Sequence, residues 1–186
     1  MFAYRYVFMA MVASVCLWSC ATTSVPTPPS PPPPATVTWL YAKEAIRLRL
    51  KSDPQLNLFQ RRPHALHACI YQLRDLNGLN QLMEEKDGMQ KLLECGRFDG
   101  SVTHAKRIIV QPGRESEEVL DRADETKQVA VAAGYYRLNK ETSVRTFPVP
   151  VVKVGMWPAS STVPGILLVD LHFGPQQIID PEAPAK

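Results

Sequence analysis

The sequence predicts a mainly β fold, a β-sandwich with a short helical insertion. Short apolar stretches recur between turn residues at regular spacing, which is typical of sandwiches built from short strands. In the clearest of these stretches apolar and charged residues alternate, the pattern of a strand with one buried face. A segment near the middle of the chain instead places its apolar residues three or four positions apart, which indicates helix.

The first two strands are predicted on either side of a polar loop. Along Ile46–Lys51 apolar residues alternate with basic ones, which gives this strand one buried and one solvated face. Ser52-Asp53-Pro54 ends the strand, and residues 55–64 form the loop. Leu66–Leu73 follows as the second strand, with apolar side chains pointing to both faces.

The helical insertion follows the second strand. Leucines and methionines at helical spacing predict two short helices, over residues 76–83 and 89–93, separated by Asp87-Gly88. Asp75 is placed to cap the first helix, and Gly96 is placed to end the second.

The rest of the chain carries the remaining strands. Glu115–Asp121 is compatible with either strand or helix. Pro148 and Pro150 confine one strand to an edge or a bend. The domain is expected to cover residues 37–174, and residues 175–186 are expected to be a flexible tail. The other expected strands are Arg107–Gln111, which stops at a Pro112-Gly113 turn, Gln128–Leu138, Ser143–Val154 and Ile166–Phe173.

Composition limits the class of protein. The chain has 186 residues, 45% hydrophobic and 21% charged, which favours one globular domain with appendages and excludes a fully disordered or fibrous chain. The net charge of +3, from 21 basic and 18 acidic residues, is too small to indicate nucleic-acid binding. Proline is unevenly spread, with seven of the 17 prolines between Pro26 and Pro34.

The N-terminus predicts export and lipidation. Arg5 precedes the apolar run Val7–Trp18, which is shorter than the about 20 residues that span a bilayer and is typical of a signal peptide. The next residues, Leu17-Trp18-Ser19-Cys20, resemble the bacterial lipoprotein signal, in which the cysteine is acylated. We therefore expect residues 1–19 to be the signal peptide and Cys20 to carry the lipid. A plain signal peptide with an incidental cysteine is the alternative.

Residues 20–36 are predicted to link the lipid to the domain. After Cys20 the segment is uncharged and rich in proline, which favours an extended polyproline II spacer with a reach of roughly 50 Å. A ligand for a proline-recognition domain is the alternative. Ala21 follows the cysteine, and the lack of Asp at this position resembles outer-membrane lipoproteins of enterobacteria.

Cys69 and Cys95 are the two cysteines outside the N-terminal region. Because exported proteins meet an oxidising environment, we expect these two to form a disulfide that attaches the helical insertion to the second strand. Two buried free thiols are the alternative.

Residues that could carry out chemistry are scarce in the sequence. His64 and His67 lie three positions apart at a loop-to-strand junction, with no Cys or acidic cluster nearby to complete a metal site. The sequence has no nucleophile elbow, Gly-rich phosphate loop or His-Glu-x-x-His helix. We therefore expect no catalytic residues, no metal, no cofactor and no small-molecule substrate.

The loop between the first two strands is the predicted interaction surface. Its large apolar residues must either pack under the domain, as favoured for Leu56, or await a partner. Phe59 beside two arginines has the composition of a binding hot spot. The candidate partner-binding residues are Gln55, Leu56, Asn57, Leu58, Phe59, Gln60 and Arg61.

A series of short motifs supports a family resemblance. In order they are Ser52-Asp53-Pro54-Gln55-Leu56-Asn57, Ile70-Tyr71-Gln72-Leu73, Lys91-Leu92-Leu93, Val110-Gln111-Pro112-Gly113 and Val131-Ala132-Ala133-Gly134-Tyr135-Tyr136. Behind a lipoprotein signal, this order resembles the type VI secretion lipoprotein (TssJ) family over about residues 43–154. The resemblance implies a transthyretin-like β-sandwich with added helices, anchored in the outer membrane and facing the periplasm.

The resemblance also implies a non-catalytic docking function. It implies that the partner is the periplasmic C-terminal region of the inner-membrane protein TssM, and that the loop Ser52–Arg62 takes part in the contact. The proline spacer, the cysteine pair and the extended end after Pro150 depart from the family pattern. A second function class stays open: a periplasmic lipoprotein that binds a cell-wall or sugar ligand in a concave polar pocket.

Overall fold

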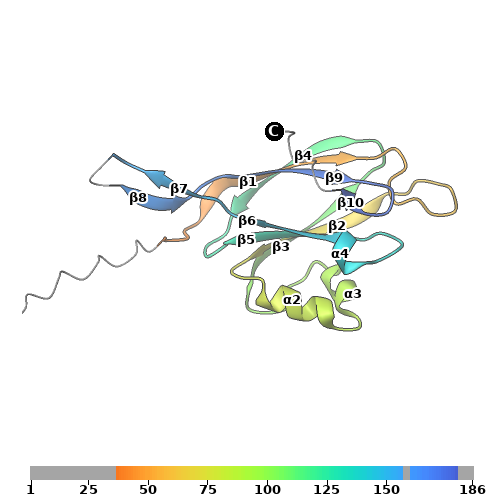
Figure 1. The fold of residues 1–186 in the computed structure, drawn as a ribbon, viewed down its shortest axis with the longest axis horizontal. Coiled ribbons are helices and arrows are strands. Elements are labelled where there is room, and N and C mark those ends of the chain that lie inside the picture. The colour runs from red at the N-terminus through yellow and green to blue at the C-terminus, as the bar shows by residue number, and fades with distance from the viewer. Residues whose placement is uncertain (1–36, 157–159, 180–186) are drawn as a thin grey trace, which may run out of the picture. The chain divides into compact units, whose positions relative to one another are not determined.

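Two four-stranded sheets face each other in the computed structural model, which describes residues 37–156 and 160–179 (Figure 1). The predicted signal peptide, Cys20 and the linker 20–36 lie outside the described residues, as do residues 180–186. None of the helices in the described part of the chain is long and apolar enough to cross a bilayer.

The first sheet has the strand order β10-β9-β1-β4. Its strands are β1 (Ala42–Ser52), β4 (Glu115–Arg122), β9 (Leu167–Phe173) and β10 (Ile178–Ile179). β1 pairs antiparallel with β4 and parallel with β9, whereas β10 pairs antiparallel with β9. The predicted alternation in β1 is confirmed, because its apolar side chains are buried and Arg49 and Lys51 are exposed.

The second sheet has the order β3-β2-β5-β6 and is antiparallel throughout. Its strands are β2 (Leu66–Leu73), β3 (Val102–Val110), β5 (Gln128–Ala133) and β6 (Val144–Pro148). β2 has the predicted bounds, and β6 is an edge strand that ends at Pro148, as predicted from the prolines. Edge strands tolerate proline because one of their sides has no hydrogen bonds to lose.

The core between the sheets is aliphatic. Ile46 and Leu48 of β1 pack in one buried cluster with Ile70 of β2, Val131 of β5 and Phe173 of β9. Successive side chains of a strand point to opposite faces, so each sheet contributes alternate residues to this layer.

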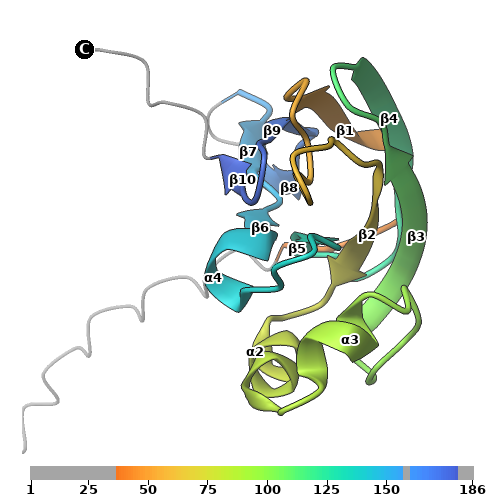
Figure 2. The same ribbon diagram turned by 90° about the vertical axis from the view of Figure 1, so that its right-hand side faces the viewer.

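The helical insertion covers the other face of the second sheet (Figures 1 and 2). Helices α2 (Asn77–Glu84) and α3 (Gly88–Leu92) bury Leu79, Leu82 and Leu92 in a second apolar cluster that contains Tyr71 of β2. Burial raises the pKa of the Tyr71 hydroxyl to about 12, and this hydroxyl donates a hydrogen bond to the carbonyl oxygen of Leu92. A neutral phenol is therefore part of the structural contact.

The predicted disulfide is confirmed. Cys69 of β2 is bonded to Cys95, which follows α3, with Cα atoms 5.2 Å apart. Cys95 has a positive φ of 56°, so the left-handed residue that ends this helical segment is the cysteine and not the predicted Gly96. Asp75 accepts a hydrogen bond from the amide of Asn77, two residues on, at the start of α2.

Several sequence expectations need correction. The ambiguous stretch 115–121 is strand because it pairs with β1, and the apolar run 128–138 leaves the sheet after Ala133. The prediction of a flexible tail from residue 175 is wrong for residues 175–179, because β10 pairs with β9 and buries Ile178 against the core.

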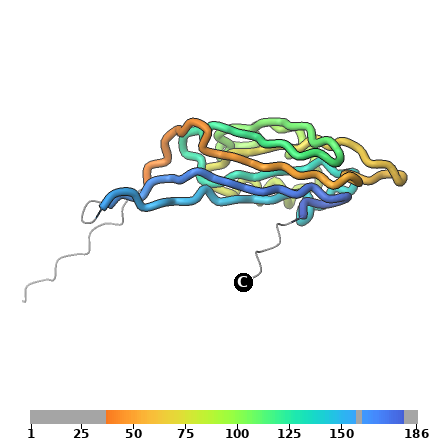
Figure 3. Tube along the Cα trace, turned by 90° about the horizontal axis from the view of Figure 1, so that it is seen from above, coloured from red at the N-terminus to blue at the C-terminus, as the bar shows by residue number. Residues whose placement is uncertain are grey.

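The remaining elements lie at the two ends of the sandwich. A short helix, α4 (Lys140–Ser143), precedes β6, and β7 (Val151–Val154) and β8 (Ser161–Pro164) form a separate two-stranded hairpin. Figure 3 shows this hairpin at the end where the described chain begins and the β1–β2 loop at the opposite end.

Candidate partner-binding site

The β1–β2 loop, residues 53–65, is fixed to the sandwich by its own backbone. Leu56 is 0% exposed and belongs to the core cluster. The Leu56 carbonyl accepts a hydrogen bond from the His64 amide at 3.0 Å, and the Leu58 amide donates to the Pro175 carbonyl at 2.9 Å. The buried Leu56 side chain and these two backbone hydrogen bonds hold the exposed tip of the loop in one position.

Asn57 connects the loop to the segment that follows β5. Its side chain is 5% exposed, and its Oδ1 accepts a hydrogen bond of 2.9 Å from the amide of Tyr136. Asn57 has a positive φ of 48°, a conformation that asparagine adopts more readily than most residues. The buried Asn57 side chain therefore fixes the β1–β2 loop at a set distance from a second exposed loop, the segment that follows β5.

Gly134 lets the second of these loops approach the sheet. Its amide donates to the His67 carbonyl at 2.9 Å, and a Cβ at this position would lie 2.9 Å from Cε1 of His67. A larger residue would force the His67 ring to move and would crowd the His67 carbonyl oxygen, 3.1 Å from the added Cβ. The limited space at position 134 therefore explains why the Gly134-Tyr135-Tyr136 motif begins with glycine.

Three aromatic rings gather where the two loops meet. Phe59 and Tyr136 stack with centroids 4.3 Å apart and an interplanar angle of 19°. The ring of His64 meets that of Tyr136 edge-on at 5.3 Å. Phe59 is 43% and Tyr136 54% exposed, so the stack presents apolar area to solvent. The rings restrain each other and would lose little conformational entropy on binding a partner.

A cavity of about 400 Å³ lies beside the stack. Tyr135, which lines it, is 3% exposed, and its hydroxyl has no hydrogen-bond partner among the described residues. Burial raises the pKa of this hydroxyl above its ordinary value, so it stays a neutral donor. The cavity is lined by Asn57, Leu58, Phe59, Gln60, Arg61, Tyr135, Tyr136, Arg137 and Gln176.

The charge around the stack is positive. Arg61, Arg62 and Arg137 are exposed, and none of the described residues that line the cavity is acidic. Arginine can pair with a carboxylate through two hydrogen bonds and can also stack on rings. The surface therefore combines aromatic area with cations suited to an acidic protein partner.

The structure divides the predicted partner-binding residues into two groups. Phe59, Gln60 and Arg61 are exposed beside the stack, and Gln55 is exposed near the start of the loop. Leu58 is half-buried. Leu56 and Asn57 are buried, so they hold the loop rather than present a surface. Leu56 thus packs under the domain, as the sequence favoured.

Sequence reasoning missed Tyr136 and Arg137 as surface residues. They lie at the end of an apolar run that was predicted to continue as strand to Leu138, and such a strand would have kept them away from the loop. The available signal was Gly134, a residue that often ends or bends a strand.

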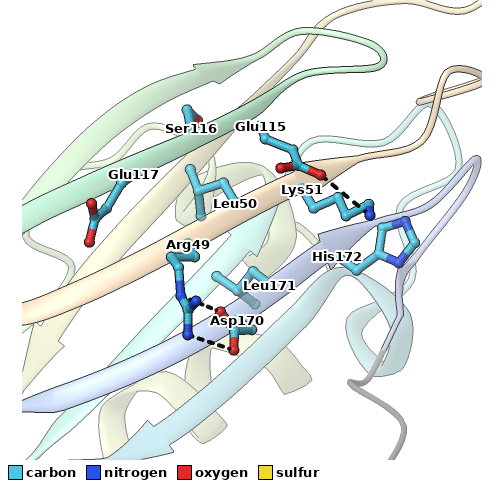
Figure 4. A pocket seen from close by; sticks show the side chains of 9 residues that line it. All are labelled: Arg49, Leu50, Lys51, Glu115, Ser116, Glu117, Asp170, Leu171 and His172. Atoms are coloured by element: carbon cyan, nitrogen blue, oxygen red, sulfur yellow. Dashed lines mark hydrogen bonds and ion pairs between the residues drawn. The ribbon is translucent and has the colours of Figure 1, made fainter.

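A larger cavity, of about 630 Å³, lies on the outer face of the first sheet (Figure 4). There Arg49 Nε is 2.8 Å from Asp170 Oδ1, and Lys51 Nζ is 3.3 Å from Glu115 Oε1. Because these exposed charges pair with one another, this face resembles an ordinary solvated sheet surface. Within residues 37–156 and 160–179, no group of three or more His, Cys, Asp or Glu side chains is placed to hold a metal ion.

Comparison of the chain with models of known protein families identifies the family to which it belongs. The model of the type VI secretion lipoprotein family (VasD, EvfM, TssJ) matches residues 44–166. The chain belongs to this type VI secretion lipoprotein family. The match spans β1 to the end of the β7–β8 hairpin, and so includes the β1–β2 loop and the helical insertion. No curated protein sequence matches the chain significantly.

Solved structures show the same sandwich as this type VI secretion lipoprotein. Serratia marcescens Lip, a membrane-bound component of the type VI secretion system, has 16% identity and a TM-score of 0.55, over 74% of this chain and 96% of that chain. The lipoprotein TssJ1 from Pseudomonas aeruginosa has 18% identity and a TM-score of 0.51, over 78% and 98%. A chain in the structure of the TssM C-terminal domain from EAEC has 15% identity and a TM-score of 0.56, over 74% and 98%.

Proposed function

We propose that this type VI secretion lipoprotein is a non-catalytic docking protein. Acylated Cys20 anchors it in the outer membrane, facing the periplasm. The domain binds the periplasmic C-terminal region of a TssM-type inner-membrane protein and so connects the secretion membrane complex to the outer membrane. The lipoprotein signal, the family match and the fold shared with type VI secretion proteins support this proposal.

The partner surface is the exposed end formed by the two loops, with the Phe59–Tyr136 stack at its centre. The single observation that carries this assignment is the stack itself, two half-exposed rings held 4.3 Å apart on a frame fixed by Leu56 and Asn57. Clustered aromatic and arginine residues contribute most of the binding energy in many interfaces. Gln60, Arg61 and Arg137 surround the rings.

The Phe59→Ala variant tests the surface. Truncation removes stacked apolar area at the centre of the interface. The free energy of binding to the TssM-type periplasmic region should therefore weaken by at least about 2 kcal/mol, which raises the dissociation constant about thirtyfold. Because the ring is 43% exposed, the free energy of unfolding should change far less than for a core phenylalanine. Titration calorimetry and denaturant unfolding of the same preparation measure the two quantities.

The matched control is Leu168→Ala. Leu168 is an exposed apolar residue of β9, 66% accessible, and lies outside the two loops. It should leave the partner affinity unchanged. Equal affinity of wild type and Phe59→Ala, with a sharply lower melting temperature for Phe59→Ala, would place the interface elsewhere.

The Cys20→Ser variant tests the anchor. Serine lacks the thiol that accepts the lipid, so the protein should stay unprocessed or leave the outer-membrane fraction. Fractionation with labelled fatty acid measures this. Label incorporated into Cys20→Ser protein that still fractionates with the outer membrane would exclude Cys20 as the lipidation site.

A further inference from the structure

The β7–β8 hairpin exposes apolar side chains that belong to neither of the two buried clusters. Every residue from Val151 to Met156 is exposed, and Met156 is 86% accessible. A two-stranded hairpin by itself is marginally stable in water, and a projecting apolar one is typical of a contact surface. We therefore expect the apolar side chains of the hairpin to contact another molecule or surface.

The register of the hairpin places three of its four valines on one face. Val152 pairs with Val163, and Val154 pairs with Ser161, so Val152, Val154 and Val163 point to the same side. Lys153 pairs with Thr162 on the other side, and so does Val151 with Pro164. One face of the hairpin therefore carries three branched apolar side chains and no charge, and the other carries the cation beside a further valine.

The hairpin stands where the chain arrives from the N-terminal segment. Arg122, 4% exposed, donates from Nη1 to the Gly165 carbonyl at 2.9 Å and from Nη2 to the Leu40 carbonyl at 3.2 Å. One buried guanidinium therefore joins the base of the hairpin to the first described residues, and Figures 1 and 3 show both at the same end. We call this the hairpin end, residues 37–41, 121–125, 150–156 and 160–165.

The charge carried by the hairpin itself is positive. Between Pro150 and Gly165 the sequence has one charged residue, Lys153. The carboxylates near the base of the hairpin are already engaged: Asp121 and Asp124 accept hydrogen bonds from Tyr41, and Glu125 pairs with Arg74. An apolar face with a nearby cation suits a membrane surface, where the apolar side chains can contact the acyl chains and the cation can contact anionic headgroups.

We propose that the β7–β8 hairpin inserts its valine face and Met156 into the surface of the membrane that holds the lipid anchor. This inference rests on the proposed acylation of Cys20. Tethering brings the hairpin to the membrane without a diffusive search, and hairpin insertion fixes the orientation of the domain. The opposite end, with Phe59 and Tyr136, then points into the periplasm.

Backbone hydrogen bonding limits the depth of insertion. Within residues 37–156 and 160–179, β7 and β8 pair only with each other, so the outer edge of each strand has no strand partner for its amide and carbonyl groups there. These groups must stay hydrated, because an unsatisfied backbone group in hydrocarbon is strongly unfavourable. The hairpin therefore reaches the boundary between headgroups and acyl chains, and does not cross the bilayer.

Depth-dependent fluorescence quenching tests the inference on the whole lipoprotein. Trp39 and Trp157 of the mature chain are replaced by Phe, and Met156→Trp supplies the reporter. The protein is reconstituted in vesicles of phosphatidylethanolamine and phosphatidylglycerol with bromine either near the headgroup or near the end of the acyl chain. The reporter should be quenched by the shallow bromine and much less by the deep one. Phe59→Trp in the same background is the matched control and should not be quenched.

A second variant shows that the valine face is responsible. Val152→Asp with Val154→Asp should abolish the quenching at position 156, while the melting temperature and the affinity for the TssM-type region stay unchanged. Equal quenching at positions 156 and 59, or none at 156 in an acylated protein, would overturn the inference. Intact-protein mass reports acylation separately. Quenching at 156 in an unacylated chain would support the hairpin contact and overturn the anchor.

Discussion

The loop end and the hairpin end of the sandwich both expose apolar side chains, but they hold them differently. At the loop end the Phe59–Tyr136 stack is fixed by the buried Asn57, whose Oδ1 binds the Tyr136 amide at 2.9 Å. At the hairpin end the valines belong to two strands that, in the described part of the chain, pair only with each other. The hairpin is joined to the sandwich chiefly through its base, where Arg122 binds the Gly165 carbonyl.

This difference matches the kind of contact that each end can make. A protein partner of fixed shape is recognised by pre-organised rings and by cations in defined positions. A lipid surface has no fixed shape, so it requires apolar area and a cation but little rigidity. Under the two proposals made above, one domain carries a specific protein interface at one end and a non-specific membrane contact at the other, and so bridges a membrane and a protein.

The largest expected effect concerns the frame of the loop end. Leu56→Ala leaves a cavity in the core cluster, because Leu56 is fully buried, and should lower the free energy of unfolding by about 2–5 kcal/mol. Val152→Ala at the hairpin end removes a half-exposed side chain and should change it by about 0.5 kcal/mol or less. Denaturant unfolding measures both. Equal losses for the two variants would contradict the contrast between a packed loop and a projecting hairpin.

A smaller effect is expected for the residue that holds the hairpin. Arg122→Met leaves the Leu40 and Gly165 carbonyls without their buried donor, and should lower stability by about 1–3 kcal/mol. The loss should be local, with faster amide hydrogen exchange in residues 37–41, 150–156 and 160–165. Arg137→Met, an exposed change at the loop end, is the control and should have almost no effect on exchange. Unchanged exchange near Gly165 in Arg122→Met would show that the hairpin is held by other contacts.

The smallest expected effect is a pH dependence confined to the hairpin end. There the Tyr41 hydroxyl and the Glu44 amide donate to the Asp121 carboxylate and lower its pKa, whereas at the loop end the corresponding acceptor is the non-titrating Asn57. A lowered folded-state pKa means that the stabilisation is complete above the unfolded value of 3.8 and is lost as the pH falls through the folded value.

The Asp121→Asn variant checks this sign. Its melting temperature should lie slightly below that of the wild type at pH 7, and the difference should shrink as the pH falls below 4. A difference that grows on acidification would reverse the assigned role of Asp121. Asn57→Asp at the loop end serves as the comparison, because it introduces a titrating acceptor where the wild type has none.

The sequence by itself determined the elements whose signals are local. The alternation along Ile46–Lys51 is a property of one strand and predicted which face of β1 is buried. The bounds of β2 and the Cys69–Cys95 bond were also predictable, because an exported chain with one cysteine pair has a single possible bridge. The motifs near β1, β2 and the β3–β4 turn were sufficient to indicate the family that the comparison later established.

Only the tertiary structure decided the contacts between distant segments. Residues 115–121 are strand because β1 offers them a pairing edge, and Ile178 is buried because β9 does the same for β10. The sequence favoured burial of Leu56, but the extent of burial was decided by the fold, which buries Leu56 fully in the core cluster and leaves Phe59 43% exposed. Tyr136 reaches Phe59 across a long stretch of chain, and no local pattern encodes that distance. The physical reason is that local sequence sets propensity and periodicity, whereas burial depends on which surfaces the folded chain brings together.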